Sequence, residues 1–306
     1  MTQQAWTVTG PQTVRLDRVA ALDATVIGGR IDVVAHDDPT RTDAVVEVHS
    51  VTGRPLEVTV DGGSLRVGYG SWGAGWKGFL ERFRTYTGKD AADVHVAVPA
   101  RTAVKVATVQ GEGLVAGMRE GVRVGTVSGS VVTSRTSGEL RVDTVSGEVS
   151  ASEHDGAVRM DSVSGGLTAT GALRSLRVDS VSGSVTVDTR TTPSEVRVSA
   201  VSAHVLLRLP DPDVMDYAIS CVSGRLLVDG VQQRGTPGTF TQPARFGEGA
   251  PVRVTAVSGD VTVLRGSPED VQDAPVDEPV HDDAGAPGWG TPGPRDRAAT
   301  GGPVDL

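Results

Sequence analysis

Apolar and polar residues alternate with a period of two through the middle of the chain, and this alternation returns at a fixed interval. One set of apolar pairs repeats every 18 residues, and a second set follows nine residues after the first. The pairs are Val122/Val124, Leu140/Val142, Val158/Met160 and Leu176/Val178, then Val149/Ala151, Leu167/Ala169 and Val185/Val187. A period of two is typical of half-buried β-strands. Each unit therefore predicts two short strands, and we expect an all-β fold.

The tripeptide Val-Ser-Gly marks the same point in successive units. It recurs at steps of 18 residues at Val127, Val145, Val163 and Val181. The register continues, with Gln110 or Ala203 replacing one motif residue and longer final steps, at Val109, Val201, Val222 and Val257. A unit this short cannot bury its own apolar residues, so successive units must share one core. We predict a single parallel β-solenoid (β-helix) of about eight 18-residue coils.

The Val-Ser-Gly motif is expected to form a corner of each coil, with its valine pointing into the core. On that expectation, Val163→Asp would place a charge among stacked valines and cost several kcal/mol of stability. Glycine occupies the third position in seven of the eight copies, and Ala203 occupies it in the other. A glycine at a fixed corner indicates a positive φ angle or close stacking of neighbouring corners.

Composition divides the chain into four parts. Residues 1–67 alternate like strands at irregular intervals and predict a β-rich N-terminal cap, whereas residues 91–265 carry the repeats. Between them, residues 68–90 form an aromatic insert. Residues 266–306 predict a disordered acidic tail rich in Pro and Gly, because they hold most of the net charge of −9 and little aliphatic periodicity. The body before the tail is therefore close to neutral.

The repeat units VRVGTVSGSV, LRVDTVSGEV, VRMDSVSGGL and LRVDSVSGSV, preceded by a strand-rich segment, resemble the bacterial putative-adhesin domains of unknown function. The resemblance covers roughly residues 10 to 265. It implies a β-solenoid with a non-enzymatic, envelope-associated or scaffolding role. The family supplies no established catalytic or ligand-binding residues to transfer to this chain.

A column of cations is predicted on one outer face, because the residue after the first inward position is basic in seven coils. Its members are Lys105, Arg123, Arg141, Arg159, Arg177, Arg197 and Arg253. Arg123, Arg141, Arg159, Arg177 and Arg197 are candidate contacts for a polyanion. The favoured interpretation is a solvated ladder, because Asp143, Asp161 and Asp179 lie two residues further along the same face.

The same three aspartates suggest a carbohydrate-active β-helix enzyme, since such enzymes place carboxylates on an outer face for acid–base chemistry. Each aspartate has an arginine two residues away, and no coil adds a second acid at a matching position. The column is therefore interpreted as a consequence of the repeat. The serines of the motif are explained in the same way, by hydrogen bonding in turns.

The aromatic insert contains six of the 11 aromatic residues of the chain. Trp76, Phe79, Leu80 and Phe83 follow helical spacing, which predicts one short amphipathic helix. Two interpretations remain open. The helix docks on an anionic membrane or a protein partner through Trp72, Trp76, Phe79 and Phe83, or it packs its aromatic stripe over the solenoid.

Several functional classes are disfavoured by missing motifs. A single cysteine, Cys221, excludes an internal disulfide, and the six histidines are scattered without metal-ligand spacing, with His154 and His204 expected as surface variations. No catalytic residues, cofactor or metal site is predicted. No secretory signal or run of about 20 apolar residues is visible, so we expect a cytoplasmic protein, with peripheral membrane association as an option.

The leading hypothesis is a non-enzymatic scaffold or binding protein that acts through protein–protein or peripheral surface contacts, including self-association. A carbohydrate-active enzyme and a polyanion-binding protein that uses the arginine column are the alternatives. Nucleic acid is not an expected partner, and no small-molecule substrate is evident.

Overall fold

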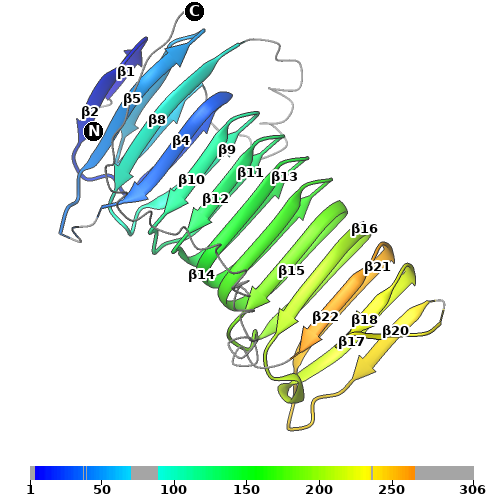
Figure 1. Ribbon diagram of the computed structural model, residues 1–306. Helices are drawn as coiled ribbons and strands as arrows, with labels where there is room; N and C mark the ends of the chain where they lie inside the picture. Colours follow the sequence, from blue (N-terminus) through cyan, green and yellow to red (C-terminus); the bar gives the residue numbers. More distant parts are fainter. Residues whose placement is uncertain (1–3, 37, 39, 70–88, 236, 266–306) are drawn as a thin grey trace, which may run out of the picture.

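The computed structural model describes residues 4–36, 38, 40–69, 89–235 and 237–265. These residues form 22 β-strands that hydrogen-bond into one continuous sheet, and one short 3₁₀ turn at Pro212–Val214. The strands stack side by side into an elongated body (Figure 1). The predicted all-β class is confirmed. The segment predicted as an amphipathic helix, with Trp72, Trp76, Phe79 and Phe83, and the predicted tail both lie outside the described residues.

Each coil contributes one strand to each of two faces. The face with the predicted cations, called the arginine face, contains β7 (Ser64–Gly68), β3 (Ala21–Val26), β9 (Ala103–Thr108), β11 (Val122–Thr126), β13 (Ser137–Thr144), β21 (Ala250–Ser258) and β17 (Met215–Ser223). The opposite face contains β8 (Ala91–Val98), β4 (Gly28–Ala35), β10 (Glu112–Ala116), β12 (Ser130–Ser134), β22 (Val261–Arg265) and β18 (Leu226–Val228). Three long strands bend through both faces: β14 (Glu148–Ser162), β15 (Gly166–Thr189) and β16 (Glu195–Leu209).

The register between neighbouring strands follows the 18-residue repeat. Val122 lies opposite Val104 on one side and Leu140 on the other, and all three strands run parallel. The inward residues of both faces, such as Val142 and Leu167, are almost completely buried and belong to one hydrophobic core. Equivalent residues of the repeat therefore return in parallel register, as a β-solenoid requires. The number of coils remains a prediction, because both ends depart from the regular pattern.

At both ends, the spatial order of strands differs from their order in the chain. Near the N-terminus, β3 lies between β7 and β9, and β4 lies between β8 and β10. Near the C-terminus, β21 lies between β16 and β17, and β22 lies between β16 and β18; both inserted strands are orange in Figure 1. Early and late segments are thus interleaved, which a simple addition of successive coils does not produce.

Antiparallel strands cover the ends of the parallel stack. They are β1 (Gln4–Val8), β6 (Leu56–Asp61), β2 (Gln12–Leu16) and β5 (Ala44–Thr52) at one end, and β19 (Val231–Gln232) and β20 (Gly238–Gln242) at the other. Arg265 fastens the second end: it pairs with Asp229 at 2.6 Å and lies over the rings of Tyr217 and Phe240. Covering the terminal coils in this way keeps parallel strand edges and core residues away from solvent.

The prediction that the Val-Ser-Gly valine points inward is wrong. Val163 and Val181 are each 51% exposed, and the preceding residue of the coil faces the core instead. Thr126 and Thr144 are buried at that position, where the hydroxyl oxygens lie 2.9 Å from the Gly129 carbonyl and 3.2 Å from the Gly147 carbonyl. The threonine thus satisfies a buried carbonyl that valine could not, so Val163→Asp is not expected to disturb the core.

The prediction of close stacking at the corner glycines agrees with the structure. A Cβ atom added to Gly147 would overlap the carbonyl oxygen of Gly129, and one added to Gly165 would overlap that of Gly147. The corner formed by Val-Ser-Gly, called the first corner, therefore has no room for a side chain at Gly147 or Gly165.

Candidate functional site

The structure brings the predicted cations together in one column of the arginine face. Strand register places Arg123 between Lys105 and Arg141, and then continues in single steps toward Arg253. The members in spatial order are Lys105, Arg123, Arg141, Arg159, Arg177, Arg197 and Arg253. Like charges at this spacing repel, so the column depends on neighbouring anions.

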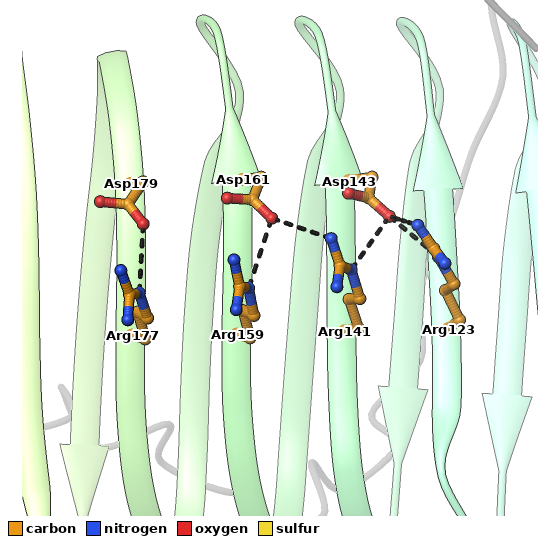
Figure 2. Close-up of polar contacts among 7 residues, drawn as sticks. All are labelled: Arg123, Arg141, Asp143, Arg159, Asp161, Arg177 and Asp179. Atoms are coloured by element: carbon orange, nitrogen blue, oxygen red, sulfur yellow. Dashed lines mark hydrogen bonds and ion pairs between the residues drawn. The ribbon is translucent and has the colours of Figure 1, made fainter. Parts of the chain in front are cut away.

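Aspartates of the next column pair with these arginines across neighbouring coils (Figure 2). Asp143 accepts hydrogen bonds from Arg123 at 2.8 and 3.0 Å, and Arg141 approaches the same carboxylate at 3.6 Å. Asp161 lies 3.3 Å from Arg141 and 3.5 Å from Arg159. The result is a diagonal ladder in which each of these two carboxylates holds the guanidinium groups of two successive coils.

The ladder neutralises the middle of the column. Asp143 is only 3% exposed, with two guanidinium groups beside its carboxylate. Its register partner Gly125 has no side chain that could separate Arg123 from this carboxylate. Arg177 pairs with Asp179 at 3.4 Å and Arg197 with Glu195 at 2.8 Å. The charge pairing expected for a ladder is present, although Asp143 is buried rather than solvated, and the pairing leaves few uncompensated cations for a polyanion.

A line of exposed valines runs along the first corner, and sequence reasoning missed it. These residues, called the corner ridge, are Val163, Val181, Val201, Val257 and Val222 in spatial order, and each is between 46% and 51% exposed. These valines lie on the outside of the coils and do not belong to the hydrophobic core. Exposed apolar surface that is continuous is typical of interaction sites.

The serines beside the ridge fix its shape. The Ser164 hydroxyl donates to the carbonyl of Val145 at 3.0 Å, and the Ser182 hydroxyl donates to that of Val163 at 3.2 Å. Backbone hydrogen bonds follow the same steps, with the Ser182 amide donating to the Val163 carbonyl at 2.7 Å. Each corner is thus tied to the one before it, so the valine methyl groups are held in a preformed row.

The exposure of this valine column changes along the solenoid. Val145 and Val127, the next members toward the N-terminal end, are half-buried, and Val109 is only 9% exposed. The corner ridge is therefore confined to the C-terminal half. Strict alternation could have revealed its orientation, because Val145 lies three residues after the inward Val142 and so falls on the outer side.

The turn that returns each coil to the arginine face is called the second corner. An open hollow of about 460 Å³ lies beside it in part of the solenoid. Its lining includes His36, Arg119, Arg135, Glu153 and Asp155. Arg135 and Glu153 occupy equivalent positions in successive coils, with φ angles of 51° and 53°. A non-glycine residue in the left-handed region costs roughly 1 kcal/mol or more. The hollow has both charge signs, and neither Arg119 nor Arg135 forms an ion pair with another described residue.

His154 lies in the core behind this hollow, so its expected place on the surface is wrong. It is 1% exposed, its Nε2 lies 3.3 Å from the Ala157 carbonyl, and its Nδ1 lies 3.0 Å from the Thr136 hydroxyl. A carbonyl can only accept, so Nε2 carries the proton and Nδ1 accepts from Thr136. Burial lowers the pKa of His154, an effect that the Ala157 carbonyl and Asp155 partly oppose.

Within the described ranges, no group of three or more His, Cys, Asp or Glu side chains could hold a metal ion. No helix among these residues is long and apolar enough to cross a membrane.

The comparison with protein families decides the classification. The model of the family described as Toastrack DUF4097 matches residues 30–264. The chain belongs to this family. The Toastrack DUF4097 family is one of unknown function, and membership agrees with a β-solenoid. The match spans most of the chain, including the cation column from Lys105 to Arg253 and both corners.

Solved structures provide two further comparisons for this Toastrack chain. A putative lipid binding protein from Parabacteroides distasonis shares 12% identity at a TM-score of 0.44, over 84% of this chain and 96% of the other. A putative cell adhesion protein from Clostridium sporogenes shares 9% identity at a TM-score of 0.27, over 83% of this chain and 99% of the other. Among proteins of curated function, none matches the sequence.

Proposed function

We propose that this Toastrack protein is a non-enzymatic binding scaffold whose corner ridge is its protein-docking surface. The observation that carries the proposal is the row of half-exposed valines on a corner held by serine hydrogen bonds. Because the row is preformed, docking would bury apolar surface without the cost of ordering a loop. The regular solenoid of about eight coils acts as the frame that presents it.

The chemistry of the arginine face supports a structural role for its charged groups. The carboxylates of Asp143 and Asp161 are each paired with guanidinium groups of two coils, which supports a charge-pairing role for them. A polysaccharide screen checks the enzyme alternative. Turnover that disappears in Asp161→Asn would contradict the proposal, and the proposal predicts no turnover in either protein.

Site-specific photo-cross-linking in the native cell tests the docking surface directly. A photoreactive residue at Val181 is expected to form adducts with a polypeptide that mass spectrometry can identify. The matched control is Thr168, an exposed residue of the same strand, β15. It lies in the part of β15 that belongs to the opposite face of the solenoid. Equal labelling from the two positions, or no adduct from Val181, would refute a docking role for the ridge.

A further inference from the structure

The spacing of the corner ridge limits what can fit against it. Parallel strands of neighbouring coils are about 4.8 Å apart, so the valines repeat at that interval. An α-helix repeats at about 5.4 Å per turn, and an extended strand returns to the same side about every 6.6 Å. Another β-stack has the same spacing as the ridge. A second copy of this chain therefore supplies a surface that stays in step along the whole row.

The extent of the ridge favours an antiparallel arrangement. Val201 is the middle member, with Val163 and Val181 on one side and Val257 and Val222 on the other. A two-fold axis at Val201 places Val163 of one protomer against Val222 of its partner. This pairing uses all five exposed valines and leaves out the half-buried Val145, which would lie beyond the partner's last ridge residue.

The residues that flank the ridge are compatible with the same arrangement. On the side of the arginine face, the positions two residues before the valines are Asp161, Asp179, Ser199, Thr255 and Ser220. In the antiparallel pairing, Asp161 faces Ser220 of the partner and Asp179 faces Thr255 of the partner. At these positions carboxylates thus meet hydroxyl donors, and no like charges oppose each other.

We propose that the corner ridge is the interface of an antiparallel two-fold dimer of this chain, with Val201 on the axis. The inference rests on the proposed function, since it names the partner that docks on the ridge. The interface is isologous, as closed dimers require. It is also narrow, and we expect a reversible dimer whose population depends on protein concentration.

Cysteine cross-linking tests the register of the dimer. The chain's single cysteine, Cys221, is buried in register with Ala256, so Cys221→Ala provides a cysteine-free background. In that background, Val201→Cys is expected to form an intermolecular disulfide, because the axis brings the two copies of this position together. Val163→Cys copies would lie about 19 Å apart, four coil spacings, and should cross-link at least tenfold more slowly. A mixture of Val163→Cys and Val222→Cys chains should give the mixed disulfide.

Sedimentation measures the self-association of the wild-type protein and of two lysine variants. Val201→Lys should weaken self-association at least tenfold without lowering the melting temperature, whereas Thr168→Lys should leave self-association unchanged. A wild-type protein that remains monomeric over the whole concentration range would overturn the dimer. Self-cross-linking of Val163→Cys as fast as Val201→Cys would overturn the antiparallel register. If the protein is monomeric but Val181 still photo-cross-links to another polypeptide, the docking function stands and only the dimer fails.

Discussion

The two corners of the coil follow different rules. The first corner repeats the same Val-Ser-Gly pattern, and its glycines pack directly on the carbonyl oxygen of the preceding corner. The second corner varies from coil to coil, carries charged residues with positive φ angles at Arg135 and Glu153, and encloses the buried His154. Close stacking fixes the first corner, whereas the second has room for sequence change. A repeat protein can therefore keep its stacking constant at one corner of the coil and vary its side chains at the other.

The largest effect is expected inside the strand that leads into the first corner. Val178 is fully buried and Val181, three residues later in β15, is half-exposed. Val178→Asp should cost about 4 kcal/mol or prevent folding, because it places an unpaired charge in the core. Val181→Asp should change stability by about 0.5 kcal/mol or less. Denaturant unfolding at low protein concentration measures both. Equal losses would mean that the first corner buries its valine after all.

An intermediate effect should separate the two corners by their glycines. A Cβ at Gly147 has no space at the first corner, whereas a Cβ at Gly121, beside the second corner, would only touch the Glu139 carbonyl at 3.5 Å. We expect Gly147→Ala to cost about 3 kcal/mol through overpacking, and Gly121→Ala to be nearly neutral. Urea unfolding of the two variants provides the comparison. A similar cost at both positions would remove the distinction between the corners.

The smallest effect concerns acid pH and belongs to the second corner. The pKa of His154 is lowered by burial from its ordinary value of 6.5, so the unfolded chain takes up the proton first as the pH falls. The stability that neutral His154 contributes is complete above about pH 6.5 and is lost as the pH falls through its lowered pKa. His154→Leu should flatten the pH dependence of the melting temperature in this range, with Asp155 left in place. His204→Leu, at an exposed position, is the control. An unchanged pH profile in His154→Leu would contradict this role.

The repeat predicted the fold better than it predicted the surface. Alternation and the 18-residue step were sufficient for parallel strands in register and for the cation column, because both follow from local sequence. The apolar side chain of Val163 indicated a place in the core, whereas its position in the alternation places it on the outer side, where the structure has it. The burial of the hydroxyl residues before it depends on hydrogen bonds to corner carbonyls, which hydrophobicity does not encode. The hollow could not be predicted, because Arg135 and Glu153 beside it have positive φ angles, and an arginine or a glutamate in the sequence does not indicate such an angle.

The interleaved strands at the C-terminal end have a consequence for the order in which the chain can fold. The edge of β16 on the arginine face is paired by β21, which is synthesised after β17 and the loop that follows it. Until Ala250–Ser258 has left the ribosome, that edge is open, and β17 lacks the strand that joins it to β16. The solenoid can grow coil by coil only up to β16. Its last coil closes by insertion of a late strand, so the core cannot close before β21 has been synthesised.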